Sequence, residues 1–408
     1  MPTLLSINNY YYRRGGAEVV FLEQNRIMER AGWMVAPFCM EHENNADSMW
    51  KRYFVNEIEF GKNYSLAEKI TKAANIIYSW ESKKKISDCA MELRPDIAHA
   101  HNVYHHISPS IFSSLKKLNI PTVLTLHDLK IACPAYKMLS TDGICERCKG
   151  GHLWNVIRKR CIKDSVSLSS VVFFESLINN MLGSYSKNID KFVVPSMFYL
   201  NKFVEWGWRR EKFVYIPNFV DVEAYIPDDK IGKAFVYFGR LGPEKGVATL
   251  IRAASKVNVP LRIVGTGPEE KSLRSLVRSL DADVEFLGYK VAPDLHDAIR
   301  SARAVVLPSE WYENAPISIL EAYALGRPVI GSRIGGIPEL IREGQTGSVF
   351  TAGDIDELAA VLRRYVEFPD SQLAEMGQEA RNWVEVDFTF IKYRERLFSL
   401  YRDLGVDC

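Results

Sequence analysis

The sequence lacks a long apolar segment and a strong net charge of either sign. No apolar run approaches the roughly 18 residues that cross a bilayer. The first residues, MPTLLSINNYYYRRGG, lack the ordered regions of a signal peptide. A formal net charge of +2 over 408 residues gives no general reason to expect nucleic acid as a partner. We therefore expect a cytoplasmic protein that does not bind nucleic acid.

Cysteine is scarce. The chain has 7 cysteines, which are too few for a disulfide scaffold in 408 residues. Their distribution is uneven, and a cluster lies in ACPAYKMLSTDGICERCKGGHLWNVIRKRC. The central CERC has the spacing of a tetrahedral zinc site, and four thiolates would complete that site. Two interpretations stay open, a structural zinc site or unbound thiols. The clustered cysteines are Cys133, Cys145, Cys148 and Cys161.

The common nucleotide signatures are also missing. The phosphate-loop pattern of nucleoside triphosphatases does not occur, and RIVGTGPEEKSL lacks the third glycine of a dinucleotide fingerprint. Nicotinamide cofactors are therefore disfavoured. The acidic triplet that begins at Asp281 precedes a predicted strand, and the one that begins at Asp354 opens a predicted helix. We interpret them as solvated or capping carboxylates, so no divalent metal is expected at the chemistry.

What the sequence does contain is a repeated order of strand, loop and helix. Short β-branched or aromatic runs such as TLLSIN, TVLTLH and KFVVPS alternate with helical spacing such as AEVVFLEQNRIMERAG. The order restarts with FVYIPN and AFVYFG, and continues through LRIVG, VEFLG, AVVLPS, PVIGS and SVFTA. Such alternation predicts parallel sheets covered on both faces. The length favours two domains, so we predict an α/β protein with two doubly wound halves.

The predicted boundaries follow from these patterns. The first domain covers residues 1–208 and contains a cysteine-rich insert at about 129–163, where the alternation breaks. The second domain covers residues 209–386. The last segment, residues 387–408, is predicted to be a helix that packs back on the first domain.

One strand exit of the second half has the features of a phosphate site. In YFGRLGPEKGVATLIRA, glycines lie between a strand and a helix together with Arg240 and Lys245. Glycine allows a close backbone approach, a helix start offers free amide groups, and two fixed cations suit a diphosphate. A glycine turn with two solvated basic residues is the alternative, which the strand and helix context disfavours. In the first half, Gly15 and Gly16 precede a helix with Glu18 in its first turn, and helix capping explains these residues equally well.

Two glutamates stand out in SEWYENAPISILEAYALGRPVIGS. Pro316 suits a first helical position and Gly326 suits a stop, which predicts a helix over residues 316–325. Glu313 lies just before this helix, and Glu321 lies on its polar edge. Carboxylates accept hydrogen bonds from paired hydroxyls. Beside the cationic loop they predict a ligand with sugar at both ends and phosphate between, although two surface glutamates are the simpler alternative.

These motifs together resemble the retaining glycosyltransferases of the GT-B fold, carbohydrate-active family 4. The resemblance rests on GRL, EKG, IVGTGPEE, FLGY and ENAPISILEAYALGRPVI, and on NN…GGAE, TLHD, VVPS, PNFVD and GGIPELI elsewhere in the chain. It implies two Rossmann-like domains that face each other across a cleft. It also implies transfer of a sugar from a UDP- or GDP-sugar to a glycan or lipid-linked acceptor, without a metal, in surface polysaccharide synthesis.

The resemblance also implies roles for individual residues. Arg240 and Lys245 would bind the donor diphosphate and stabilise it as a leaving group. Glu313 would contact the transferred sugar, Glu321 would hold the ribose, and His127 would face the donor sugar. The remaining donor-binding positions are Gly15, Gly16, Gly239, Gly265, Gly267, Leu287, Asn314, Ala315, Pro316 and Ile317.

Other interpretations remain open. A sugar-nucleotide epimerase of the same fold would use the same donor, and a zinc-stabilised binding protein would hold the donor without turnover. The basic and aromatic residues of the insert, followed by SVVFFESLINNMLGSY, suggest contact with the inner face of the membrane. A core helix with a solvated basic face is the alternative explanation for that segment.

Overall fold

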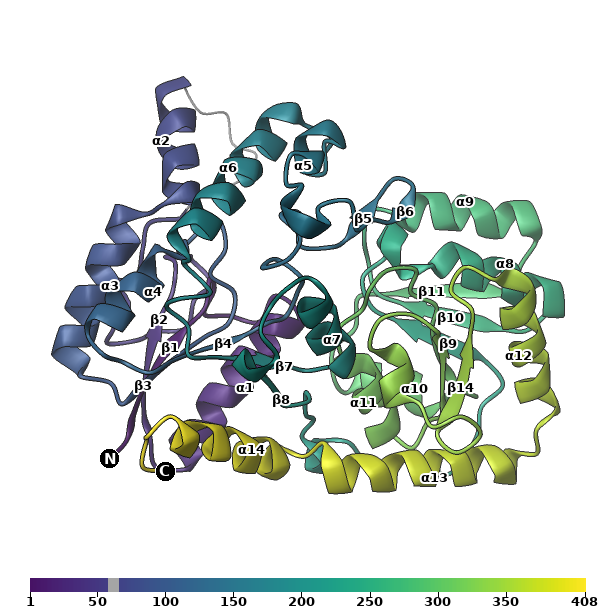
Figure 1. The fold of residues 1–408 in the computed structure, drawn as a ribbon. Coiled ribbons are helices and arrows are strands. Elements are labelled where there is room, and N and C mark those ends of the chain that lie inside the picture. The colour runs from purple at the N-terminus through teal and green to yellow at the C-terminus, as the bar shows by residue number, and fades with distance from the viewer. Residues whose placement is uncertain (58–65) are drawn as a thin grey trace. The chain divides into compact units, whose positions relative to one another are not determined.

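The computed structural model describes residues 1–57 and 66–408, and these residues divide into two compact units (Figure 1). Unit 1 comprises Met1–Pro195, Tyr199–Ile216 and Arg394–Cys408. Unit 2 comprises Ser196–Phe198 and Pro217–Tyr393. The chain therefore passes between the units more than once, and most of its last helix belongs with the beginning of the sequence.

Within the described residues, unit 1 is built on a six-stranded sheet in the order β2-β1-β3-β4-β7-β8. Every neighbouring pair of these strands is parallel. All residues of β1, β3 and β4 are buried, as expected for strands whose sheet is covered by helices on both faces. The strands are β1 (Thr3–Ile7), β2 (Met34–Phe38), β3 (Ile97–Ala100), β4 (Thr122–Thr125), β7 (Lys191–Val194) and β8 (Phe213–Tyr215).

The helices of unit 1 form where the predicted spacing occurs. In α1, the buried residues Val20, Phe21, Ile27 and Met28 recur at helical intervals and give the helix one apolar face. The cysteine-rich insert contains only short elements in its described residues, namely the hairpin β5 (Leu139–Ser140) and β6 (Gly143–Ile144), a 3-10 turn (Lys149–Gly151) and the helix α5 (Asn155–Arg158). The other helices are α1 (Gly16–Arg30), α2 (Leu66–Ile77), α3 (Trp80–Leu93), α4 (Ser110–Lys117), α6 (Val166–Leu182), α7 (Met197–Glu205) and α14 (Phe390–Asp403).

Unit 2 has a second parallel sheet, six-stranded in its described residues, in the order β11-β10-β9-β12-β13-β14. Its strands are β9 (Phe235–Phe238), β10 (Leu261–Val264), β11 (Val284–Gly288), β12 (Val305–Leu307), β13 (Val329–Ser332) and β14 (Gly347–Phe350). Its helices are α8 (Val247–Val257), α9 (Glu270–Leu280), α10 (Asp294–Arg300), α11 (Ile317–Ala324), α12 (Ile355–Glu367) and α13 (Asp370–Asp387).

Each face of the second sheet carries its own apolar core. Phe235 and Tyr237 of β9 pack with residues of α8 and α12, whereas Val236 and Phe238 pack on the opposite face with residues of α11 and α13. This alternation is the period of two that a strand imposes on its side chains. The doubly wound architecture predicted from the sequence is therefore confirmed (Figure 1).

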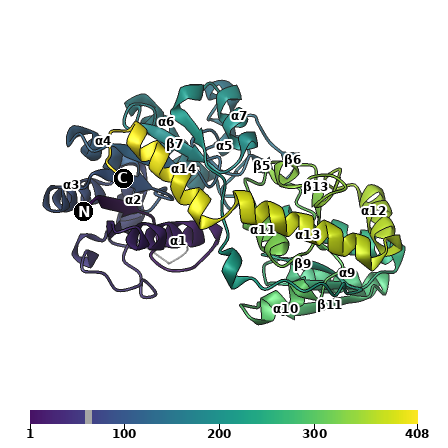
Figure 2. The same cartoon turned by 90° about the horizontal axis from the view of Figure 1, so that it is seen from below.

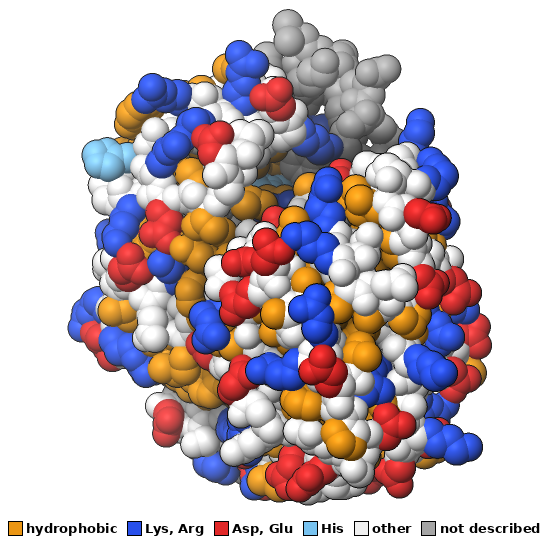
Figure 3. All heavy atoms as spheres, turned by 90° about the vertical axis from the view of Figure 1, so that its right-hand side faces the viewer, with side chains coloured by type: hydrophobic (Ala, Val, Ile, Leu, Met, Phe, Trp, Pro, Cys, Tyr) orange, Lys and Arg blue, Asp and Glu red, His pale blue; other side chains and the backbone are white. Residues whose placement is uncertain are grey.

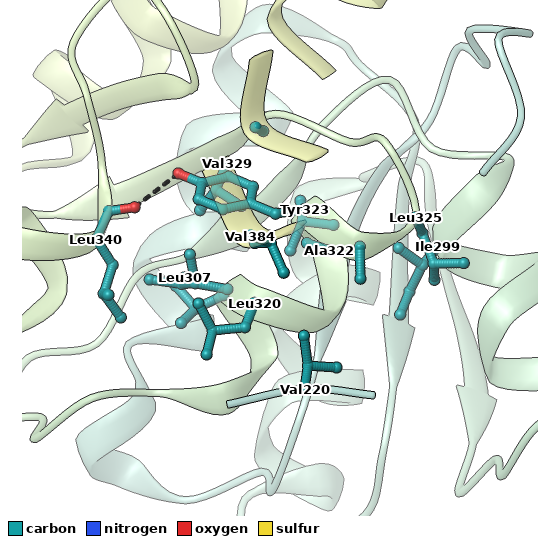
Figure 4. Packing of buried hydrophobic residues seen from close by; sticks show 14 of the residues in the cluster. Val220, Ile299, Leu307, Leu320, Ala322, Tyr323, Leu325, Val329, Leu340 and Val384 are labelled. Carbon is teal, nitrogen blue, oxygen red and sulfur yellow. Dashed lines mark hydrogen bonds between the residues drawn. The ribbon is translucent and has the colours of Figure 1, made fainter. Parts of the chain in front are cut away.

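Figure 4 shows the core beneath α11, which supports the predicted glutamate helix. Tyr323 lies among buried aliphatic side chains, and its hydroxyl donates to the carbonyl oxygen of Leu340 at 2.8 Å. The same hydroxyl lies 2.9 Å from Oγ1 of Thr346. The polar tip of an otherwise apolar side chain is thus satisfied inside the core.

Some predicted boundaries require correction. FVYIPN was assigned to the second domain, but β8 pairs with β7 and places Phe213 beside Phe192 in unit 1. The boundary at residue 208 therefore falls too early, because unit 1 continues to Ile216. A strand pattern alone does not say which sheet the strand joins.

The predictions for the glutamate helix and for the terminal helix also differ in detail from the structure. α11 begins at Ile317 and ends at Ala324, and Pro316 precedes it with an extended backbone (ψ 117°). The terminal helix α14 runs over Phe390–Asp403, and unit 1 resumes at Arg394 rather than at residue 387. Figure 2 shows α13 and α14 in yellow. In unit 1, α14 places the ring of Phe398 on Trp33, with centroids 5.7 Å apart.

We predict that Tyr323→Phe lowers the free energy of unfolding by about 1 to 3 kcal/mol, because it leaves the buried carbonyl oxygen of Leu340 without its donor. Tyr289→Phe is the matched control, since Tyr289 is 76% exposed. Urea unfolding of both variants measures the difference. Equal stability of the two variants would contradict the role given to the buried hydroxyl.

Candidate active site

The loops of interest in unit 2 leave the carboxyl ends of two central strands. β9 and β12 are neighbours, and the chain runs outward from β9 through β10 to β11 and outward from β12 through β13 to β14. The boundary between β9 and β12 is therefore the point where the strand order reverses, which is where doubly wound sheets bind ligands. The loop after β9 carries Arg240 and Lys245, and the loop after β12 carries Glu313.

The structure brings Lys245 and Glu313 into direct contact. Nζ of Lys245 lies 2.6 Å from Oε1 of Glu313, and Oγ of Ser309 donates to the same oxygen at 2.7 Å. Nζ of Lys245 also lies 5.1 Å from the ring centroid of Trp311. Glu313 is only 8% exposed, so its charge is held by a cation and a hydroxyl and is little screened by water. Ser309 and Trp311 had no signal of their own in the sequence.

Close backbone contacts hold these loops together. Gly246 has φ +64°, and a Cβ at this position would lie 1.9 Å from the carbonyl oxygen of Pro308, at the end of β12. Gly265 has φ +133°, and its Cβ would lie 1.9 Å from the carbonyl oxygen of Gly239. A side chain has no room at either position. Packing of the loops therefore explains these glycines, and contact with a donor stays a prediction for Gly239, Gly265 and Gly267.

Arg240 lies on the exposed side of the same loop. Its guanidinium pairs with the carboxylate of Glu244, which is buried, and its carbonyl oxygen accepts a hydrogen bond of 2.8 Å from the hydroxyl of Tyr237. The backbone is thus fixed while half of the Arg240 side chain stays exposed. Glu244 lies within the predicted GPEKG loop, but nothing in the sequence marked it as the partner of Arg240.

Glu321 lies on α11, as predicted. Oε1 of Glu321 accepts a hydrogen bond of 3.1 Å from the hydroxyl of Tyr225, and the Tyr225 ring stacks on His296 with centroids 4.5 Å apart. Tyr225 and His296 were not predicted, because they are distant from Glu321 in the sequence. Leu287 packs against the core of unit 2. Its contact with a donor stays a prediction.

The segment between the two glutamates is fixed mainly through its backbone. The amide of Gly336 donates to the carbonyl oxygen of Glu313 at 2.8 Å, and Nδ2 of Asn218 donates to that of Ala315 at 2.7 Å. Oδ1 of Asn314 accepts a hydrogen bond of 2.8 Å from Ser196. These contacts place residues 313–316 between β12 and the start of α11. Contact with a donor through Asn314, Ala315, Pro316 and Ile317 remains a prediction.

In unit 1, His99, His101 and His127 form a stacked column at the ends of β3 and β4. Neighbouring ring centroids are 5.0 and 5.1 Å apart. Nδ1 of His101 lies 2.8 Å from Nε2 of His127. His99 lies 2.7 Å from the hydroxyl of Tyr401 on α14 and 2.7 Å from that of Thr125. The terminal helix thus contacts the column at His99. This contact was not predicted from the sequence.

The column must be uncharged at neutral pH. Burial lowers the pKa of His127 to about 4 and that of His99 to about 3, and it lowers the pKa of His101 well below the ordinary value. A hydrogen bond between two imidazoles needs one N–H and one lone pair. Nε2 of His101 is buried without a hydrogen-bond partner in the described residues. A lone pair is tolerated there better than an N–H, so His101 donates from Nδ1 and His127 keeps its proton on Nδ1.

Polar residues surround this column at the same sheet edge. Burial raises the pKa of Glu18, and this effect is opposed by Arg14 and by hydrogen bonds with Asn102 and Asn8. Glu18 is therefore a buried member of a polar cluster rather than only a partner of the helix dipole. Gly15 precedes α1 and Gly16 begins it, and both are exposed. Gly15, Gly16 and His127 belong to unit 1, so their roles toward a donor held by unit 2 remain predictions.

The clustered cysteines line the same small cavity in unit 1. Within residues 1–57 and 66–408, no three His, Cys, Asp or Glu side chains are already grouped as a metal site. The cysteines are present as free thiols. Convergence of the thiols is therefore observed, and occupation by zinc stays a prediction.

The segment predicted to be either a membrane contact or a core helix is α6. It buries Glu175 and Asn179 but leaves Phe174 49% and Met181 75% exposed. It is thus not an ordinary core helix, and membrane contact stays a prediction.

None of the helices in the described part of the chain has the length and hydropathy of a membrane span. The face drawn in Figure 3 carries acidic and basic side chains interspersed, which is unlike a nucleic-acid-binding surface of one charge.

The fold and the position of these loops define the class of protein. The chain is similar over nearly its whole length to sucrose-phosphate synthase from Thermosynechococcus elongatus, with 17% identity, a TM-score of 0.72 and 99% of each chain covered. It is also similar to the Anabaena protein HepE, solved with UDP and glucose, with 18% identity, a TM-score of 0.68 and coverage of 99% and 100%. The architecture is the GT-B fold with two Rossmann-like domains.

Family models identify the chain more closely. Residues 14–224 match Glycosyltransferase Family 4, and residues 226–383 match Glycosyl transferases group 1. The chain belongs to the family 4, group 1 glycosyltransferases and is a glycosyltransferase.

The chain is also similar to curated proteins. An uncharacterized 42.6 kDa protein in the cps region of Klebsiella pneumoniae is 26% identical, with 83% of this chain and 87% of the relative covered. A GDP-mannose-dependent phosphatidylinositol monomannoside mannosyltransferase from Corynebacterium glutamicum is 29% identical, with 52% of this chain and 62% of the relative covered.

We predict that the buried histidines destabilise the protein in acid. Between pH 6.5 and 5 the unfolded chain protonates His99, but the folded chain does not until about pH 3. Stability is therefore lost as pH falls through this window, and His99 accounts for about 2 kcal/mol of the loss. Urea unfolding at both pH values should show a decrease smaller by that amount in His99→Gln. The exposed His152→Gln is the control and should keep the wild-type decrease; identical decreases in both variants would contradict the assignment.

Proposed function

We propose that this glycosyltransferase moves a sugar from a nucleoside diphosphate sugar to a glycan or lipid-linked acceptor, with retained anomeric configuration and without a metal at the chemistry. The observation that carries the proposal is the contact between Lys245 and Glu313 at the reversal point of the second sheet. It joins a phosphate-binding cation and a hydroxyl-binding carboxylate where ligands of this fold bind.

The charges suit departure of a diphosphate. When the bond between the anomeric carbon and the phosphate oxygen breaks, negative charge builds on the diphosphate. Lys245 is held by Glu313, and Arg240 lies on the same fixed loop. Cations that are already in position stabilise such charge with little reorganisation. The acceptor hydroxyl would attack from the face that the diphosphate leaves, and its proton would pass to the departing phosphate oxygen.

The carboxylates have a separate task. Glu313 and Glu321 each already accept hydrogen bonds from protein hydroxyls, from Ser309 and Tyr225. A carboxylate has about four lone-pair positions, so each can also accept a hydroxyl of the transferred sugar or of the ribose. Neutral His127 would act as a hydrogen-bond partner of the donor sugar rather than as an acid.

The relatives and the similar structures support classes of donor and acceptor rather than particular compounds. HepE is described with UDP and glucose, and the Corynebacterium relative is named as GDP-mannose-dependent, so UDP- and GDP-sugars are the donors to test. The Klebsiella relative lies in a cps region, and the similar structure WaaB is described as a lipopolysaccharide outer core galactosyltransferase. A role in polysaccharide or glycolipid synthesis is therefore proposed.

Donor identity can be tested directly. UDP-, GDP- and ADP-sugars are screened for thermal stabilisation of the full chain, and the donor that binds is followed for release of nucleoside diphosphate with and without acceptor. NMR of the product reports the anomeric configuration. Conversion of the donor without release of nucleoside diphosphate would indicate an epimerase, and binding without turnover under every acceptor condition would indicate a binding protein.

We predict that Lys245→Ala and Glu313→Gln each lower kcat by about 100-fold or more, because each removes a group that stabilises the departing diphosphate or positions the sugar. Lys256→Ala is the matched control, because Lys256 lies on α8 in an exposed ion pair with Asp356. The control should stay within a few-fold of the parent. Variants of Lys245 and Glu313 that keep parental kcat and lose only thermal stability would show that the ion pair is structural.

A further inference from the structure

The cysteine-rich insert has little structure of its own to hold it together. Its described elements are β5, β6, α5 and a short 3-10 turn over Lys149–Gly151. Its buried apolar residues are few, and they include Met138, Leu153 and Val156. Segments with so small a core usually need a covalent or metal cross-link to keep one conformation.

The fold brings together thiols that are separated in the sequence. The cavity in the insert is lined by Cys133, Ala135, Leu139, Cys145, Cys148, Asn155, Val156 and Cys161. Its volume is about 10 Å³, which is on the order of the space for one water molecule. The other cysteines, Cys39, Cys89 and Cys408, do not line it. The convergence therefore selects the same four cysteines as the sequence pattern.

Hydrogen bonds fix the backbone at Cys133, at Cys145 and in the CERC turn. The amide of Cys133 donates to the carbonyl oxygen of Leu129 at 2.7 Å, and that of Cys145 donates to Met138 at 2.8 Å. Nδ2 of Asn155 donates to the carbonyl oxygens of Arg147 at 2.7 Å and His152 at 3.0 Å. The turn that carries the CERC motif is thus tied to α5.

Burial raises the pKa of the Cys133, Cys148 and Cys161 thiols, and neighbouring backbone and basic groups oppose this rise. The backbone groups of Ala135 and Met138 hydrogen bond with the sulfur of Cys133, and Val156 does so with Cys148. Lys159 acts electrostatically on Cys161. A zinc ion with four thiolates has a net charge of −2, and hydrogen bonds and cations near the ligands compensate such a charge. The basic residues of the segment are Arg147, Lys149, Arg158, Lys159, Arg160 and Lys163.

We propose that Cys133, Cys145, Cys148 and Cys161 bind one zinc ion in a closed tetrahedral site. Binding releases the thiol protons and draws the sulfurs from the cavity wall to Zn–S distances of about 2.3 Å. With four protein ligands the ion has no open position. Its role is therefore to cross-link the insert and not to take part in sugar transfer.

The site would fix the segment that follows His127. That segment is already held on its other side, where Nζ of Lys130 lies 2.7 Å from Glu175 of α6, with side chains 3% and 1% exposed. The zinc site and this buried ion pair together hold residues 130–138 in place. An effect of zinc on acceptor binding rests on the proposed function, whereas zinc binding itself does not.

The test is metal analysis of the full chain, purified without chelator or added metal. We expect one zinc ion per chain, and the metal should be lost in Cys145→Ser and Cys148→Ser. Cys408→Ser is the matched control, because this cysteine is exposed and lies outside the cavity. It should keep the metal. Since the unmodified chain is analysed directly, a variant that fails to fold does not decide the result.

Two further measurements identify the ligands. Cobalt added to the chelator-treated chain should give the visible absorption of a tetrahedral thiolate site, and zinc should protect four thiols from alkylation. The proposal is overturned if the purified chain binds neither zinc nor cobalt, or if non-reducing mass spectrometry finds the four cysteines in disulfides. Loss of transferase activity with zinc still bound would count against the proposed function and not against the metal site.

Discussion

The ion pair between Lys245 and Glu313 depends on a backbone constraint, and the candidate active site depends on both. The two residues lie in loops that leave β9 and β12. These loops can meet because Gly246 allows the backbone to approach the carbonyl oxygen of Pro308. A side chain at Gly246 would separate the loops and with them the cation and the carboxylate. The glycine thus sets the distance between the charges.

The candidate site residues of unit 1 are buried neutral histidines, whereas those of unit 2 are paired charged side chains. His99, His101 and His127 are kept neutral by their surroundings, and Tyr401 of the terminal helix supports the column from below. A neutral His127 can donate a hydrogen bond from Nδ1 and carries no positive charge.

Much of the fold could be predicted because local patterns report it. The strands were recognised from short β-branched runs, and the glutamate helix was located to within a residue or two at each end. Sheet membership could not be predicted for Phe213–Tyr215, because pairing with Phe192 is a contact between distant segments. For the same reason Tyr225, His296 and Tyr401 were missed. Tyr225 contacts Glu321 and stacks on His296, and Tyr401 contacts His99 in the histidine column.

The sequence by itself indicated a ligand with sugar and phosphate, because residue types at strand exits limit what a loop can bind, and its resemblance to family 4 indicated sugar transfer. It identified Arg240, Lys245, Glu313 and the four clustered cysteines as groups. Only the tertiary structure decided that Lys245 holds Glu313, that Arg240 is paired with Glu244, and that the cysteines share a cavity. These pairings depend on the order of strands in each sheet and on close backbone approach, and neither is encoded in any local segment.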